Sequence, residues 1–273
     1  MPSKPSMQSM TSLTEAIRSR PRLRLSLIAA GLIAVGGCAA LGLNHPATAP
    51  QPLPTIDRPT PIPKAPGRPN GASLTDAQAQ AALLTPTDLG ASWTATRGFA
   101  TWRDGMLKAT SSAGECSRLL NALYTDELLG GPPRATIGLD DTGTDAQLRY
   151  QIGARRPADV DATLGWLKSL PAQCARFTAT TDNGLQEDVR VDAAALPEVG
   201  DARQGLHLTI ATTTSDGRNR LLTMDVAAVR VGQDAFAFTN GGLGDVPNAA
   251  TQAAVQVGAL HLTDVHRRGR AQV

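Results

Sequence analysis

Hydrophobic residues recur at two different periods along residues 72–265 of the chain. A spacing of three or four is typical of a helix with one buried face, and it occurs in residues 74–84, 115–129, 159–170 and 248–262. Alternation with polar residues is typical of strands, and it occurs in residues 147–152, 206–210 and 222–226. Residue pairs that favour tight hairpin turns stand at Asn183-Gly184, Asp216-Gly217 and Gly232-Gln233. Strands joined by such turns are antiparallel, so the pattern predicts an α+β domain with an antiparallel sheet flanked by helices.

Capping and helix-breaking residues set the expected ends of these helices. Ser73 is the expected N-cap of the first helix, with Asp76 as the acid of a capping box. Residues 130–133, GGPP, should stop the second helix. Asp159 should cap the third helix, and Pro171 should follow its last turn.

The N-terminal residues 1–37 have the layout of a secretory signal. Four arginines between residues 18 and 24 precede an uncharged apolar stretch, residues 25–35, which small residues follow. Residues 1–37 carry five basic side chains and one acidic one, a net charge of 5 − 1 = +4, so the remainder carries 2 − 4 = −2. A mildly acidic exported domain lacks the basic surface that binding to nucleic acid requires, and we expect no nucleic-acid partner.

Two modes of membrane attachment are consistent with this N-terminus. Residues 35–38, VGGC, resemble the lipobox of bacterial lipoproteins. This implies that Cys38 is diacylated, with palmitate-type chains, and becomes the mature N-terminus. Alternatively, residues 25–43 form one uncleaved membrane span, because the apolar stretch continues past Cys38. Both alternatives place the following domain on the outer face of the cell membrane.

Residues 38–71 should form an extended stalk. Nine prolines lie between residues 46 and 69. Proline lacks an amide proton and fixes φ, so this segment should be disordered or polyproline-like rather than helical or in a sheet. The folded domain should therefore occupy residues 72–265, and residues 266–273 should be a flexible basic tail.

Two cysteines remain once Cys38 is assigned to the anchor. Cys116 begins the second expected helix and Cys174 follows the third. Cysteines of an exported domain usually pair, so we expect one disulfide between them. Two free thiols are the alternative, and a metal site is disfavoured because neither cysteine has a second ligand at metal-binding spacing.

Candidate chemistry in the domain is sparse. The histidines His45, His207, His261 and His266 form no metal-ligand pair, and His207 should be a solvated or hydrogen-bonded strand residue. Residues 236–245 should form a strand that runs into a glycine-rich loop before a helix, but the loop lacks the residues of a phosphate-binding motif. The acidic pairs 140–141 and 187–188 should be solvated. We therefore expect no enzyme, no cofactor and no metal site.

Three segments resemble the PknH-like family of extracellular sensor domains: residues 83–93, 115–116 and 166–177. The resemblance covers about residues 73–265 and implies an antiparallel sheet flanked by helices, with a cleft for an unidentified ligand. Domains of this family occur on receptor kinases and as stand-alone lipoproteins. The kinase-linked members have more than one disulfide, whereas this chain allows one, and it has no kinase domain.

Three functions remain open from the sequence. The preferred one is a surface-anchored, non-enzymatic sensor domain that binds a small molecule or envelope component, and a deep cleft with convergent polar groups would favour it. A structural or accessory lipoprotein that binds other envelope proteins is the second, and a flat apolar patch would favour it. An envelope hydrolase is the third, and a histidine or carboxylate cluster in a cleft would favour it.

Overall fold

The computed structural model describes residues 73–271 except 99 and 101. These residues belong to one of the two units into which the chain divides, residues 63–273. The expected signal, stalk and Cys38 anchor lie outside the described residues. The first half of the domain contains α1 (Asp76–Ala81), α2 (Pro86–Leu89), β1 (Trp93–Ala95), the π-helix η1 (Arg103–Leu107), β2 (Ala109–Thr110), α3 (Gly114–Tyr124), β3 (Ala135–Asp141) and β4 (Gln147–Gly153). The second half contains α4 (Pro157–Gln173), β5 (Arg176–Thr181), β6 (Gln186–Ala194), β7 (Ala202–Thr213), β8 (Asn219–Val231), β9 (Asp234–Leu243) and α5 (Asn248–Ala271).

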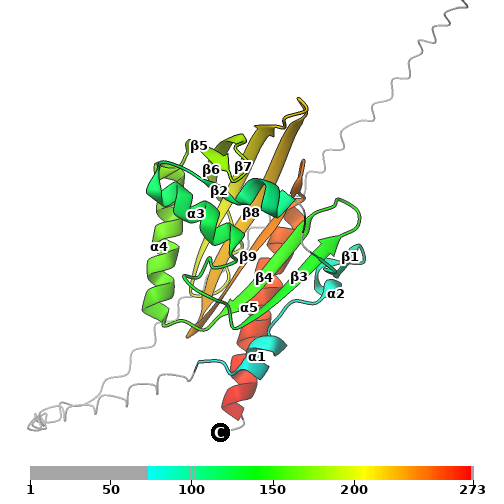
Figure 1. Ribbon diagram of the computed structural model, residues 1–273. Coiled ribbons are helices and arrows are strands. Elements are labelled where there is room, and N and C mark those ends of the chain that lie inside the picture. Colours follow the sequence, from blue (N-terminus) through cyan, green and yellow to red (C-terminus); the bar gives the residue numbers. More distant parts are fainter. Residues whose placement is uncertain (1–72, 99, 101, 272–273) are drawn as a thin grey trace, which may run out of the picture. The chain divides into compact units, whose positions relative to one another are not determined.

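One antiparallel sheet organises the domain, which confirms the predicted fold class. Its nine strands are ordered β1-β3-β4-β9-β8-β7-β6-β5-β2 (Figure 1). The three predicted turns connect β5 to β6, β7 to β8 and β8 to β9. The central strands β7, β8 and β9 are also the longest, with ten to thirteen residues each.

Helices cover the two faces of the sheet unequally. Helices α3 and α4 pack on one face, where their leucines contact the inward side chains of β6, β7 and β8. Helix α5 packs on the other face against β8, β9 and β4, around Tyr150, Phe236 and Phe238. The face of β5, β6 and β7 opposite α4 carries exposed or half-buried polar residues, because α5 does not extend over it.

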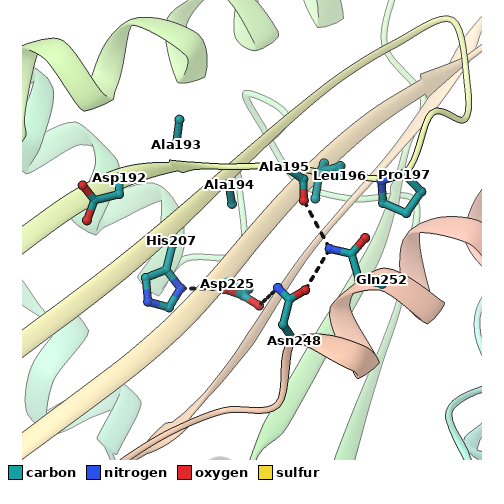
Figure 2. A pocket seen from close by; sticks show the side chains of 10 residues that line it. All are labelled: Asp192, Ala193, Ala194, Ala195, Leu196, Pro197, His207, Asp225, Asn248 and Gln252. Carbon is teal, nitrogen blue, oxygen red and sulfur yellow. Dashed lines mark hydrogen bonds and ion pairs between the residues drawn. The ribbon is translucent and has the colours of Figure 1, made fainter. Parts of the chain in front are cut away.

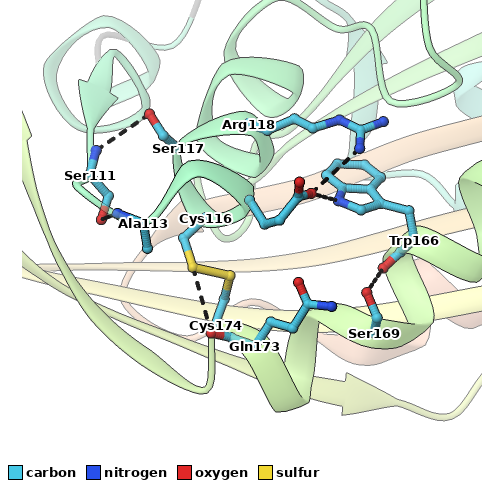
Figure 3. Close-up of a disulfide and its surroundings, with 10 residues drawn as sticks. Ser111, Ala113, Cys116, Ser117, Arg118, Trp166, Ser169, Gln173 and Cys174 are labelled. Carbon is cyan, nitrogen blue, oxygen red and sulfur yellow. Dashed lines mark hydrogen bonds and ion pairs between the residues drawn. A yellow bond between two sulfur atoms is a disulfide. The ribbon is translucent and has the colours of Figure 1, made fainter.

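The predicted disulfide joins Cys116 and Cys174, whose Cα atoms are 5.6 Å apart (Figure 3). Cys116 lies in the first turn of α3, and Cys174 is the C-cap of α4. A second contact between these helices involves Trp166, whose indole N–H donates to Glu115 at 2.7 Å. The guanidinium of Arg118 lies 4.0 Å from the centre of the same ring. The disulfide and the contacts of Trp166 with Glu115 and Arg118 hold α3 beside α4.

The predicted start of the first helix is wrong by two residues. Thr75 is its N-cap, and its hydroxyl accepts a hydrogen bond from the backbone N–H of Gln78. The side chain of Gln78, rather than that of Asp76, completes the capping box by accepting from the backbone N–H of Thr75. Ser73 donates instead to Asp234, a fully buried carboxylate at the start of β9. The side chain of Ser73 therefore bonds to a residue distant in sequence instead of capping the helix.

The other predicted helix ends also need correction. Helix α3 ends at Tyr124 rather than residue 129, because Asp126 takes a left-handed conformation, with φ of 58°. Helix α4 begins at Pro157, so Asp159 lies in its first turn, and it contains Pro171 near its end. Helix α5 continues to Ala271, so residues 266–271 are helical rather than a flexible tail.

The expected glycine-rich loop is largely strand. Gly241 and Gly242 lie within β9, opposite Met224 and Thr223 of β8. A Cβ at Gly241 would lie 3.2 Å from the side chain of Met224, so glycine permits close packing at this point. The short strands β1 and β2 at the sheet edges and the π-helix η1 were not predicted, because short segments show little periodicity. Strand β3, with seven residues, was not predicted either.

Candidate ligand-binding site

A cavity of about 580 Å³ opens on the sheet face beside the first turns of α5 (Figure 2). Its walls come from the end of β6, the centres of β7 and β8, and the start of α5. The lining residues are Asp192, Ala193, Ala194, Ala195, Leu196, Pro197, His207, Asp225, Asn248 and Gln252. Its volume is in the range that accommodates a small-molecule ligand.

The hairpin turn at residue 216 brings the two central polar residues together. His207 lies nine residues before Asp216 and Asp225 nine residues after it, and the two are cross-strand partners in β7 and β8. The same row of the sheet continues to Asp192 on β6 and Asn240 on β9. Side chains of one row project from the same face of a sheet. Four polar residues from four strands therefore form a line beside α5.

Asp225 is the centre of the polar network in the floor of the cavity. Its side chain is 4% exposed. One carboxylate oxygen lies 2.7 Å from Nδ1 of His207. The other accepts hydrogen bonds from Asn248 at 2.9 Å and from the hydroxyl of Thr251 at 2.7 Å. Because an ionised carboxylate only accepts, Nδ1 of His207 carries a proton and Nε2 is the ring nitrogen left for a ligand.

The same network attaches α5 to the chain that follows β6. The amide nitrogen of Gln252 donates to Oδ1 of Asn248 at 2.9 Å and to the carbonyl of Ala195 at 3.2 Å (Figure 2). Gly205 on β7 allows this segment to lie against the sheet, since a Cβ there would be 2.5 Å from the carbonyl oxygen of Ala194. One wall of the cavity therefore depends on a glycine and on side chains of the last helix.

Asp192 at the rim is paired with Arg190 on the same strand. The guanidinium contacts the carboxylate through two nitrogens, at 2.6 and 3.1 Å. These hydrogen bonds are the main cause that lowers the pKa of Asp192, and the charges of Arg190, His207 and Arg176 lower it further. Asp192 therefore stays ionised at neutral pH, with its charge partly compensated by Arg190.

A second cavity, of about 380 Å³, lies between η1 and the turn after β5. Lys108 and Asp182 form an exposed ion pair at its edge, with a nitrogen–oxygen distance of 2.7 Å. The hydrogen bond from Lys108 to Asp182 raises the pKa of the lysine. Exposed ion pairs contribute little to stability or recognition. This cavity is therefore a weaker candidate for ligand binding than the cavity around Asp225.

A charged cluster beneath α3 is structural rather than a site. Arg103 of η1 is 3% exposed and donates to Asp126 at 2.8 Å and to the carbonyl of Leu123 at 2.7 Å. Arg149 of β4 contacts the other oxygen of Asp126 at 2.7 Å. The cluster fixes η1 and the end of α3 to the sheet. Burial is the main cause that lowers the pKa of Arg103, whose pairing with Asp126 opposes the effect.

The remaining predicted histidines have structural partners. His261 lies 3.1 Å from the carbonyl oxygen of Leu83 and fixes α5 to the chain after α1. His266 lies 2.8 Å from the buried carboxylate of Asp234. His45 and Cys38 lie outside the described residues.

Two members of the acidic pairs, Asp141 and Glu187, are buried rather than solvated as predicted. Asp140 accepts hydrogen bonds from Thr96 and Gln147, and Asp141 accepts from Thr144, within the turn between β3 and β4. Glu187, which was expected to be solvated, is 1% exposed, and neither carboxylate oxygen has a hydrogen-bond partner. It lies on the same face of β6 as Val189 and Val191, which pack in the core, and this position explains the burial.

Sequence reasoning identified His207 but missed Asp225, Asn248 and Gln252. The turn at Asp216-Gly217 contained the signal for Asp225, because a hairpin folded there pairs residues that are equidistant from it. No comparable signal exists for Asn248 and Gln252, which reach the site only because α5 packs beside β8.

The described residues contain no group of three or more side chains suited to hold a metal ion. Within the same residues, no helix combines the length and the apolar character needed to cross a membrane.

No protein-family model matches the chain, and no curated protein matches its sequence. Among solved structures it is similar to one described as the extracellular domain of PknH from Mycobacterium tuberculosis, with 15% identity and a TM-score of 0.44. The match covers 72% of this chain and 99% of that chain. At this identity and TM-score the likeness bears on neither ligand nor chemistry, which depend on the side chains.

Proposed function

We propose that the chain is a non-enzymatic ligand-binding domain, anchored by its N-terminus to the outer face of a bacterial cell membrane. The cavity around Asp225 is the observation that carries the proposal. It is an open cavity, and its polar groups converge from three consecutive strands and from the last helix. Such a preformed cavity with a few fixed polar groups is typical of small-molecule sites.

The lining residues argue against a hydrolase. His207 and Asp225 resemble the base and orienting acid of a catalytic triad, because Nδ1 is fixed and Nε2 is left for a ligand. A triad also requires a nucleophile beside Nε2, and none of the ten lining residues is a serine, threonine or cysteine. The dyad therefore suits recognition of a ligand better than acyl transfer.

The exposed surface offers little support for an accessory protein that binds others through an apolar face. The large hydrophobic residues exposed in the described part of the chain are Leu221, Leu243 and Leu260. Leu221 and Leu243 lie on neighbouring strands, and Leu260 lies on α5. Three such residues are normal for a protein surface.

Export and anchoring are supported by the basic and apolar segments before residue 38 and by the disulfide, which is typical of an oxidising compartment. Replacing Cys38 with Ala tests the mode of attachment. For a lipoprotein, the variant should leave the membrane fraction and lose incorporation of a palmitate analogue. If wild type carries no such label and the variant stays in the membrane, residues 25–43 are a membrane span.

Native mass spectrometry of the full-length protein, extracted in detergent, tests ligand binding. Wild type should retain a bound small molecule that Ala194→Phe excludes, because residue 194 lines the cavity and phenylalanine would fill it. Thr180→Phe is the matched control, since Thr180 is exposed on β5 outside the cavity. A ligand retained equally by all three proteins would refute this site.

A further inference from the structure

The cavity uses most of its side-chain hydrogen-bond donors internally. Both protons of the Gln252 amide nitrogen have acceptors, one at Asn248 and one at the carbonyl of Ala195. The amide nitrogen of Asn248 donates to Asp225, which leaves it one N–H. Nδ1 of His207 also donates to Asp225.

The groups that remain for a ligand are mainly acceptors. Oε1 of Gln252 and Nε2 of His207 have no hydrogen-bond partner among the described residues. The carboxylate of Asp192 lies at the rim. A ligand that satisfies these groups must bring N–H or O–H donors.

Among ligands that carry donors, the negative charge of the cavity favours cations over neutral molecules and anions. No lysine or arginine lines the cavity. The carboxylate of Asp225 accepts hydrogen bonds from His207, Asn248 and Thr251, and no lysine or arginine of the described residues contacts it. Arg190 partly compensates Asp192 at the rim but does not line the cavity. A partly desolvated carboxylate attracts a cation more strongly than an exposed one.

We propose that this cavity recognises a small organic molecule through a primary ammonium group. The inference rests on the proposed function, which it deepens by naming the chemistry of the ligand. An ammonium supplies three donors and one positive charge in a compact group. A metal ion is a poorer fit, since the described residues hold no group of three metal-ligating side chains.

Three probes of nearly equal size test the charge preference: n-butylammonium, n-butanol and butyrate. Each is titrated into the full-length protein at pH 7.5, and binding is followed by ligand-observed NMR. Butylammonium should bind roughly tenfold more tightly than butanol, about the effect of one charge-assisted hydrogen bond. Butyrate should bind more weakly than butanol.

Variants assign this preference to the cavity. Asp225→Asn should remove most of the advantage of butylammonium over butanol, and Asp192→Asn should reduce it. Asp188→Asn is the matched control, because Asp188 is an exposed carboxylate on the same face of β6 outside the cavity. If Asp225→Asn does not fold, Asp192→Asn and the three probes still decide the question.

Three outcomes would overturn the inference: tighter binding of butyrate, equal binding of all three probes, or equal effects of Asp188→Asn and Asp192→Asn. Tighter binding of butyrate would mean that His207 is protonated and the cavity attracts anions. Failure of the inference is distinguishable from failure of the proposed function. A neutral or anionic molecule that wild type retains and Ala194→Phe excludes would leave a ligand-binding cavity with different chemistry.

Discussion

Replacing Glu187 with Gln should stabilise the domain at alkaline pH and change its stability little at acidic pH. Glu187 lies on β6 between Ala179 of β5 and Thr212 of β7. It shares its sheet face with Val189 and Val191, which pack in the core beneath α3 and α4. The hydroxyl of Thr212 donates to the carbonyl of Gln186, so it does not solvate the carboxylate of Glu187.

The magnitude follows from the pKa of this buried acid. Burial raises the pKa of Glu187 from 4.5 to about 7. At about 1.4 kcal/mol per pH unit, ionising Glu187 in the folded protein costs about 3 kcal/mol more than in the unfolded chain. Between these two pKa values the folded state binds more protons than the unfolded state. Stability should therefore fall as pH rises from about 4.5 to about 7, and the contribution of Glu187 should be constant above that.

Glutamine removes the ionisation and keeps the size and polarity of the neutral acid. Urea unfolding of wild type and Glu187→Gln at several pH values between 4 and 8.5 measures the difference. The free energies of unfolding should nearly coincide at pH 4, and the variant should be more stable by up to about 3 kcal/mol at pH 8.5. Other titrating groups cancel in the comparison, because both proteins contain them.

Glu127→Gln is the matched control, since Glu127 is exposed in the loop after α3. Its difference from wild type should not change over this pH range. A difference for Glu187→Gln that is also independent of pH would refute the reasoning. So would a variant that is less stable than wild type at pH 8.5, because Glu187 would then have to be ionised and paired in the folded protein.

Three further variants test the contacts that hold the domain together. Replacing Cys116 and Cys174 by Ala should lower the free energy of unfolding by about 4 kcal/mol, from the loop entropy of 58 residues; a melting temperature within two degrees of wild type would exclude this role. Asp126→Ala should cost about 3 kcal/mol in urea unfolding, because it leaves the guanidinium of Arg103 buried without its carboxylate; a loss below about 0.5 kcal/mol would contradict it. Asp234→Ala should release Ser73 and Leu74 from β9, so that limited proteolysis cleaves first in this N-terminal segment of the domain. An unchanged cleavage pattern would show that the contact with Asp234 is dispensable.

The sequence by itself determined the fold class, the disulfide pair and much of the strand register. Alternation in β4, β7 and β8 assigned each side chain to a sheet face, because successive residues of a strand point in opposite directions. The predicted turn at Asp216-Gly217 contained the register that pairs His207 with Asp225, since a hairpin pairs residues that are equidistant from its centre, but the pairing itself was recognised only in the structure. The alternation and the turns depend on neighbours in the sequence, so local patterns suffice to predict them, whereas the disulfide was predicted because two cysteines remain besides Cys38.

Only the tertiary structure decided where the helices end, which residues complete the cavity, and which acid is buried. Helix α3 stops at Tyr124 because two arginines from other elements hold Asp126. Asn248 reaches Asp225 because α5 packs beside β8. Glu187 is buried because its face of β6 packs in the core with Val189 and Val191, although its sequence neighbours are polar. Each of these outcomes depends on contacts between residues that are far apart in the chain, and the periodicity of a single segment contains no information about them.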